Sequence, residues 1–290
     1  MATNILKALL NIKKRDDNSL FNIYVIPKLN PSAVNRANNV GEALEFFMRD
    51  AFCDTFNEKS AEKKKDAYSK NFSYLGNQNN PPDIIIKEGD AIEVKKIAGL
   101  TGTDLALNSS YPKSKLFSES ALITQACKDC EKDWKEKDII YSVGFAEKDK
   151  LKLLIMVYGD CYAASPEVYE KVRKTVIDEL GKSALEFSET NELGRINRVD
   201  PLGITNLRIR GMWTIQNPLR VFSDLFNFKK GSHEFTLIAL MRKSKYATLP
   251  KDDRTSIEKD RYFNLKDVKI QDPNNPAKQL DAKLIIYNKK

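Results

Sequence analysis

Two carboxylates and a lysine lie close together in the segment NPPDIIIKEGDAIEVKK, residues 80–96. If residues 91–97 form a strand, side chains alternate between its faces, so Glu93 and Lys95 lie on the same face. Asp83 begins the preceding apolar run, and a short turn in which Gly89 can adopt a positive φ would pair the two runs as a hairpin. We therefore expect Asp83 to lie beside Glu93.

Neighbouring carboxylates repel each other unless a cation lies between them, and Mg²⁺ prefers hard oxygen ligands. A cation there would bind a phosphate oxygen, lower the pKa of a water and offset charge on the leaving oxygen. Lys95 would position or deprotonate the attacking water, or neutralise the transition state. The pattern thus predicts Mg²⁺-dependent phosphodiester hydrolysis. The alternative interpretation of the same residues is a solvent-facing hairpin with a weak Glu-Lys pair.

Length and charge narrow the class of protein. The chain has 290 residues and a net charge of +8, which suits a polyanionic partner. We expect one α/β domain over residues 1–290, with a catalytic core at about 33–160 and a DNA-recognition region at about 190–225. The sequence contains no apolar run long enough to span a membrane, and its start does not fit a signal peptide, so a cytoplasmic protein is expected.

Other catalytic chemistries have little support in the sequence. Its four cysteines do not form a disulfide framework, and Cys127 and Cys130 lack the second pair that a structural zinc site requires. The single histidine, His233, lies in a basic loop, which argues against a histidine metal cluster and a Ser-His-Asp triad. The carboxylates and Lys95 remain the candidate centre.

A helix that begins near residue 32 should pack on the strand pair. Its apolar residues recur at helical spacing and predict a buried face of Val40, Leu44, Phe47, Met48 and Phe52. Glu45 lies next to this face and could reach the metal site as a supplementary or outer ligand. A solvent-facing Glu45 paired with Arg49 fits the spacing as well.

The remaining pattern predicts a mixture of helices and strands. We expect helices at residues 3–12, 118–135 and 166–181, strands at 22–27, 138–146, 150–159, 235–241 and 280–288, an ordered loop at 72–83, a solvated helix or loop at 57–71 and a turn-rich segment through residues 252–253. The strands at 138–146 and 150–159 are almost continuously apolar, as is typical of interior strands.

Three segments carry side chains suited to DNA. Amide side chains in the first could donate to phosphates or bases, and hydroxyls and lysines in the second could hold the DNA backbone. Arginine forks in the third match guanine or two phosphate oxygens, whereas an exposed strand edge with arginines for solubility is the alternative. The candidates are Asn77 and Asn79; Ser109, Ser110, Lys113 and Lys115; and Arg195, Arg198, Arg208 and Arg210.

A resemblance to a known family covers residue 33 to the C-terminus. The segments GEALEFFMRDAF, FSYLGNQNNPPD, GDAIEVKKI, LALNSSYPKSKL, ELGRINRVDPL and RIRGMW occur in the order seen in the NgoPII family of type II restriction endonucleases, within the PD-(D/E)XK nuclease superfamily. The chain resembles that family much more specifically than the catalytic motif alone would allow.

The resemblance implies a restriction-endonuclease-like fold with a central mixed β-sheet flanked by helices. It further implies a bacterial, Mg²⁺-dependent homodimer that cuts double-stranded DNA at a short palindrome, GGCC in family members, with a methyltransferase in the same system. Asp83 and Glu93 match the metal-binding acids, Lys95 matches the motif lysine, and Glu45 resembles a helix glutamate of such centres. A DNA-binding protein without catalysis and a structure-specific repair nuclease are the competing functions.

Overall fold

The computed structural model describes residues 2–15, 36–77, 80–100, 104–108, 110–147 and 150–290. The strand expected at residues 22–27 and the helix start near residue 32 lie outside these ranges. Near the N-terminus the structure has α1 (Ile5–Lys13), α2 (Arg36–Cys53) and α3 (Ala61–Asn71). No helix of the described part is long and apolar enough to cross a membrane.

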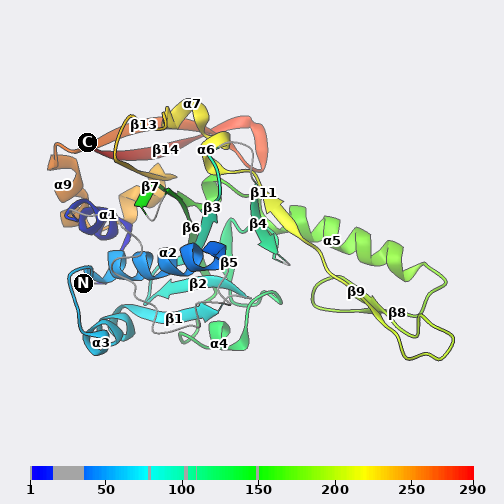
Figure 1. Ribbon diagram of the computed structural model, residues 1–290. Helices are drawn as coiled ribbons and strands as arrows, with labels where there is room; N and C mark the ends of the chain where they lie inside the picture. The colour runs from blue at the N-terminus through cyan, green and yellow to red at the C-terminus, as the bar shows by residue number, and fades with distance from the viewer. Residues whose placement is uncertain (1, 16–35, 78–79, 101–103, 109, 148–149) are drawn as a thin grey trace.

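A large mixed sheet forms the centre of the molecule (Figure 1). Its strands, in spatial order, are β1 (Phe72–Asn77), β2 (Asn80–Ile86), β3 (Ala91–Ile97), β6 (Glu136–Glu147), β7 (Lys150–Tyr158), β12 (Phe235–Arg242), β14 (Asn275–Lys289) and β13 (Phe263–Asp272), with β5 (Lys115–Phe117) beside β6. β3 runs parallel to β6 and β7 parallel to β12, whereas the other neighbours are antiparallel. The expected central mixed sheet flanked by helices is confirmed.

The interior strands are buried along most of their length, as their continuous apolar runs predicted. In β7, residues 153–157 have no exposed surface, because side chains on both faces of the strand are covered. α2 packs against β3, and on its predicted apolar face Leu44, Phe47, Met48 and Phe52 are buried. The side chain of Val40 lies outside the described set.

Several local predictions were wrong. Residues 72–83 do not form a loop but belong largely to the antiparallel strands β1 and β2. Residues 118–135 form turns around the short helix α4 (Gln125–Lys128); Trp134 Nε1 donates to the Lys128 carbonyl at 2.8 Å, which folds the chain back after this helix. The aspartates of the expected turn-rich segment begin α9 (Lys251–Lys259), where the helix dipole favours acidic side chains.

Two further differences concern turns near the predicted site. In the β2–β3 turn the positive φ, 54°, belongs to Glu88 and not to Gly89. The segment after β3 contains β4 (Leu105–Asn108), a strand that the sequence did not predict and that pairs with β11 (Trp213–Ile215). β4 forms because its residues pair with a strand far along the chain, which outweighs their local turn preference.

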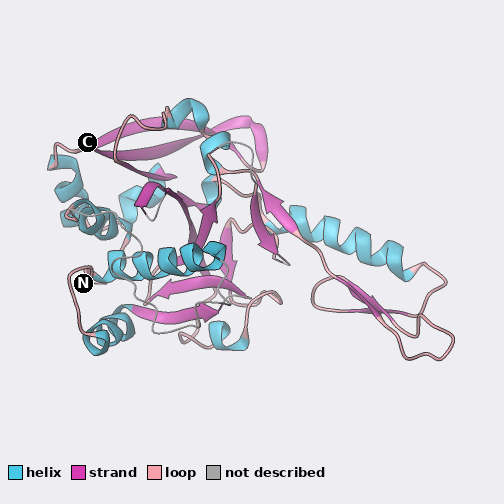
Figure 2. Cartoon of the chain, in the orientation of Figure 1, coloured by secondary structure: helices cyan, strands magenta, loops and turns pink. Residues whose placement is uncertain are grey.

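Residues 165–212 form an arm that projects from the large sheet (Figures 1 and 2). It contains α5 (Pro166–Gly181) and a small sheet of β8 (Phe187–Glu189), β9 (Gly194–Ile196) and β10 (Leu207–Ile209). At its base Tyr169 stacks on Tyr111 with ring centroids 5.4 Å apart, and Trp213 meets both rings edge-on. This aromatic group joins the arm to the segment that follows β4.

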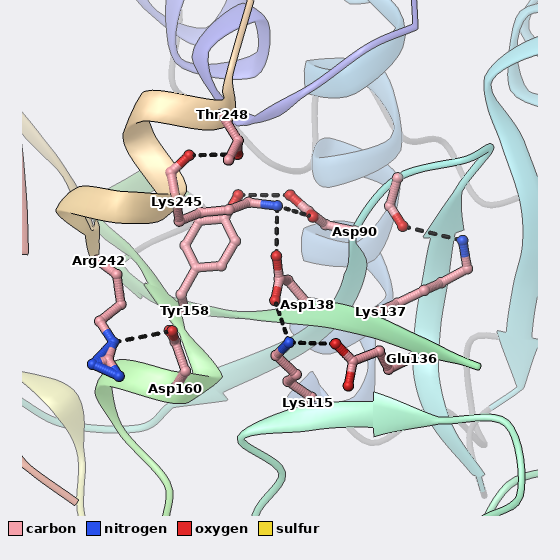
Figure 3. Close-up of polar contacts among 11 residues, drawn as sticks. Asp90, Lys115, Glu136, Lys137, Asp138, Tyr158, Asp160, Arg242, Lys245 and Thr248 are labelled. Atoms are coloured by element: carbon pink, nitrogen blue, oxygen red, sulfur yellow. Dashed lines mark hydrogen bonds and ion pairs between the residues drawn. The ribbon is translucent and has the colours of Figure 1, made fainter. Parts of the chain in front are cut away.

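A network of buried charges fixes α8 (Lys243–Thr248) to the start of β3 and to β6 (Figure 3). Lys245 Nζ donates to Asp90 Oδ1 at 2.6 Å and to Asp138 Oδ2 at 2.7 Å, and the Tyr158 hydroxyl donates to Asp90 Oδ2 at 2.6 Å. The Asp90 side chain is 9% exposed. Such a carboxylate depends on its partners, because an unpaired buried charge is strongly destabilising.

We therefore expect Lys245→Ala to lower the free energy of unfolding by about 3 kcal/mol, since Asp90 and Asp138 lose their shared cation. Urea unfolding followed by circular dichroism measures the change. Lys243→Ala is the matched control, because Lys243 lies on the same helix and its ion pair with Asp267 is exposed. Equal losses in the two variants would contradict a special role for the buried network.

Candidate active site

The predicted hairpin places Asp83 beside the strand that carries Glu93 and Lys95. β2 and β3 pair antiparallel, with Ile84 opposite Ile92. The Val94 backbone N–H donates to Asp83 Oδ2 at 2.6 Å, so the Asp83 carboxylate reaches across to β3 directly after Glu93. Asp83, Glu93 and Lys95 are therefore brought together as the sequence predicted.

Glu93 and Lys95 form an ion pair on one face of β3, as the alternation of the strand requires. Lys95 Nζ lies 2.6 Å from Glu93 Oε1, and the glutamate side chain is 8% exposed. The other oxygen, Glu93 Oε2, is buried and has no hydrogen-bond partner among the described residues. Buried polar atoms are rarely left without partners, so Glu93 keeps one oxygen available for a cation.

The electrostatics of the three groups are coupled. Burial raises the pKa of Asp83 well above its ordinary value, and the nearby charges of Glu93 and Glu45 raise it further. Burial by itself would lower the pKa of Lys95, but Glu93 and Asp83 outweigh this effect and the pKa of Lys95 is raised. One lysine thus faces two carboxylates, and a second positive charge would relieve their repulsion.

Glu45 approaches this centre from α2 without joining the pair of acids. Arg49 Nη2 lies 3.3 Å from Glu45 Oε2, the i, i+4 pair that the sequence also allowed. Burial raises the pKa of Glu45, and Glu93 adds to the increase, which shows that the carboxylate lies within electrostatic reach of the centre. Among the described residues, no three side chains of His, Cys, Asp or Glu gather as ligands of one metal ion.

Lys113 lies closer to the centre than the sequence indicated. It is 5% exposed, and a small pocket is lined by Glu93, Ser110, Tyr111, Lys113 and Tyr141 among others. Its ammonium donates to Ser110 Oγ, and its backbone N–H donates to the Tyr141 hydroxyl at 2.7 Å. Burial lowers the pKa of Lys113 to about 8, against the opposing effect of Glu93.

The other predicted DNA-contacting lysine is elsewhere. Lys115 lies on β5, 2.6 Å from Glu136 Oε1 and 3.9 Å from Asp138 Oδ1, within the charge network of Figure 3. Asn77 ends β1, whereas Asn79 and Ser109 lie outside the described residues. The structure therefore brings Ser110 and Lys113 to the centre and leaves Lys115 away from it.

The four candidate arginines all lie in the arm, away from β3 (Figure 1). Arg195 on β9 is opposite Arg208 on β10, so their side chains share a face of the small sheet. Arg208 Nη2 and Arg210 Nε lie 2.9 and 2.7 Å from the two oxygens of Glu192. Arg198 forms an ion pair with Glu186.

A cleft of about 1000 Å³ opens where β3 ends, and the sequence analysis did not identify it. It is bordered by the turn at Gly99 and by the short helices α6 (Pro218–Val221) and α7 (Ser223–Phe226). Arg220, Lys229 and Lys230 line it. Only the excess of basic residues after residue 218 could have indicated this region, because its walls come from segments far apart in the chain.

Comparison with known proteins gives a consistent result. The model of the NgoPII restriction endonuclease family matches residues 3–271. The type II restriction enzyme NgoPII of Neisseria gonorrhoeae is 43% identical over 287 residues, which cover 98% of this chain and 99% of that enzyme. No solved structure matches. Because both matches extend over nearly the whole chain, it belongs to the NgoPII restriction endonuclease family.

Proposed function

We propose that the chain cuts double-stranded DNA at a short palindrome, GGCC, in a Mg²⁺-dependent reaction that leaves 5′-phosphate and 3′-hydroxyl ends. Membership of the family makes it a type II restriction enzyme; the metal, the site and the products are the proposal. The observation that carries it is the buried, unpartnered Glu93 Oε2 beside Asp83 and Lys95. We also assign the fold to the PD-(D/E)XK superfamily.

Asp83 and Glu93 fit a divalent cation and would hold it. Each offers carboxylate oxygens, the ligand type that Mg²⁺ prefers. Burial raises the pKa of Asp83 first, and the charges of Glu93 and Glu45 raise it further; a cation would offset these charges. A bound Mg²⁺ would supply Lewis-acid chemistry at the phosphate. Glu45 is assigned a supporting role, through its charge and through an intervening water, because Arg49 holds its carboxylate in the structure.

Lys95 would orient the attacking water and offset the charge that develops on the phosphate. Its ammonium is fixed by Glu93 and its side chain is 22% exposed, so it can reach a substrate. Ser110 and Lys113 would hold the segment that covers Glu93, whereas the basic side chains of the cleft at the end of β3 would contact DNA phosphates.

The arginine face of the arm would read the DNA bases. Arg195, Arg208 and Arg210 share this face, and Glu192 holds two of the guanidinium groups side by side. Arginine forks are the natural partners of guanine O6 and N7, which suits GGCC. A palindrome has two-fold symmetry, so we assign the active form to a homodimer in which each centre cuts one strand.

The system around the enzyme follows from this activity. We propose that it acts in the bacterial cytoplasm, where the DNA is. A cognate methyltransferase would protect the host DNA without being a stable subunit of the enzyme.

Digestion of unmethylated phage DNA tests the proposal. With Mg²⁺ the protein should give discrete fragments whose sequenced ends map to GGCC, and EDTA should prevent their formation.

Lys95→Ala should slow cutting by about 10²–10³-fold or more while DNA binding persists, because it removes a charge aimed at the reacting phosphate. The matched control is Lys96→Ala, since Lys96 lies on the opposite face of β3. Binding without cutting by the wild-type protein would identify a non-catalytic DNA-binding protein instead.

Asp83→Asn should abolish cutting and stabilise the metal-free protein. A group whose folded-state pKa is raised favours folding at low pH and loses that contribution as the pH rises through the folded pKa. Asparagine resembles the protonated acid and can still accept the Val94 hydrogen bond. The gain in melting temperature should therefore be larger at pH 8 than at pH 5, as measured by calorimetry with EDTA. A variant that is less stable at pH 8 would show that Asp83 is not under electrostatic strain.

Arg208→Ala should weaken binding to a GGCC duplex by about 1–3 kcal/mol if Arg208 reads a base. Binding to an unrelated duplex should change much less. There the protein is held mainly by phosphate contacts, which carry no sequence information, and Arg208 has no matching base to lose. Fluorescence anisotropy with both duplexes at one salt concentration gives the comparison, with Ca²⁺ in place of Mg²⁺ to prevent cutting. An equal loss on both duplexes would mark Arg208 as a phosphate contact.

A further inference from the structure

One side of α5 is apolar and exposed. Val168, Val172 and Val176 are 49%, 50% and 39% exposed, and their spacing of four residues aligns them along one side of the helix. We call these three residues the valine stripe. Valine is a weaker helix former than alanine, lysine or glutamate. The stripe therefore favours neither the formation of α5 nor its solubility in water.

Another side of α5, about 100–140° around the helix from Val172, is already occupied by the rest of the arm. Ile177 is 8% exposed, and Arg173 donates to the carbonyls of Glu192 and Thr190 at 2.8 and 3.1 Å. These contacts connect the helix to the turn between β8 and β9. The arm therefore satisfies one side of α5, and within the described residues the valine stripe is left facing outward.

The charge of α5 does not suit DNA. Its sequence, PEVYEKVRKTVIDELG, contains four acidic and three basic residues, which gives the helix a net charge of −1 in a chain with a charge of +8. A DNA-binding surface needs cations that replace counterions along the phosphates. An apolar, slightly acidic helix instead fits a protein partner that presents apolar side chains.

We propose that the valine stripe is the contact with a second copy of this chain, packed antiparallel against the same stripe across a two-fold axis. This location of the interface rests on the proposed function, because cutting both strands of a palindrome requires two related centres. A surface that meets itself across a two-fold must be complementary to itself, and a straight row of valines meets this condition. The remainder of the chain, with its excess of positive charge, would repel a copy.

Other exposed apolar side chains of the arm would have to supply the rest of the contact. A stable interface removes about 800 Å² from each partner, which is more than three valines provide. Further apolar side chains of the arm are exposed, namely Leu185, Val199, Leu202, Ile204 and Met212, at 56% to 81%. A contiguous patch of such side chains would be typical of a protein interface.

The proposed contact connects with the active centre. Tyr169 of α5 stacks on Tyr111, which belongs to the segment that covers Glu93. Helices that are paired through the valine stripe would hold Tyr169 in place, and through Tyr111 would steady Lys113. The stripe lies on α5, whereas Arg195 and Arg208 lie on β9 and β10, so the two surfaces come from different elements of the arm.

Sedimentation velocity of the full-length protein, without DNA or metal, tests the proposal. The wild-type chain should sediment as a dimer. Val172→Glu should raise the dimer dissociation constant about 100-fold or more, because the two-fold brings two unpaired carboxylates into one apolar contact. The circular dichroism spectrum and melting temperature should stay close to wild type, since the Val172 side chain is half exposed in the single chain.

Lys174→Glu is the matched control. Lys174 is exposed on the far side of the same helix, and the substitution changes the charge by twice as much as Val172→Glu. This variant should remain a dimer. A wild-type monomer at all concentrations, or a dimer that survives Val172→Glu, would overturn the proposal.

Hydrogen exchange of the wild-type chain gives a second test that does not depend on a variant. The amides of α5 should exchange more slowly in a concentrated sample than in a dilute one, and equal rates would also overturn the proposal. Cutting by the wild-type enzyme is measured separately. It can persist if the valine stripe is not the interface, and the dimer can persist if the protein does not cut DNA, so the two proposals fail independently. If both hold, Val172→Glu should accumulate nicked plasmid.

Discussion

The hydrogen bond from the Val94 backbone N–H to Asp83 Oδ2 is the contact on which the centre depends. It fixes the Asp83 carboxylate against the strand that carries Glu93 and Lys95, and so holds two acids closer than they would stay in water. β3 supplies the rigidity, because it is paired with β2 on one side and with β6 on the other. The backbone hydrogen bonds of the sheet therefore hold the two acids in place against their mutual repulsion, which a loop could not do as well.

The segment that covers Glu93 is held with similar rigidity. The Tyr141 hydroxyl of β6 accepts the Lys113 N–H, and a Cβ at Gly159 would lie 2.3 Å from the Lys113 carbonyl oxygen. Only glycine allows the chain to pass at that distance, so this residue fixes the depth at which Lys113 is buried. The lysine that borders the centre is therefore positioned by residues of β6 and by the turn after β7, far from it in sequence.

Local sequence was sufficient to predict the strand pair that carries Asp83, Glu93 and Lys95, because the information for this pair lies within one hairpin. Alternation placed Glu93 with Lys95, and the apolar runs predicted β6 and β7. It failed for the neighbouring hairpin: the amides and prolines of residues 72–83 suggested a loop, yet Tyr74 and Leu75 pair with Ile85 and Ile84, because ladder hydrogen bonds outweigh the local turn preference of these residue types. Lys113 and Lys115 are two residues apart and look equivalent in sequence, but one is buried beside Glu93 and the other joins Glu136 on β5.

The ion pairs of the arm arginines would serve specificity if these side chains read bases, as proposed. Arg208 and Arg210 already share the carboxylate of Glu192, so a DNA contact must replace a made ion pair. A hydrogen bond to a single phosphate oxygen would compensate poorly for the lost ion pair with Glu192. The two acceptors of a guanine would compensate better, because they match the guanidinium fork. Discrimination depends on the difference between right and wrong partners. If these arginines read guanines as proposed, Glu192 would lower binding to random DNA more than binding to the recognised site.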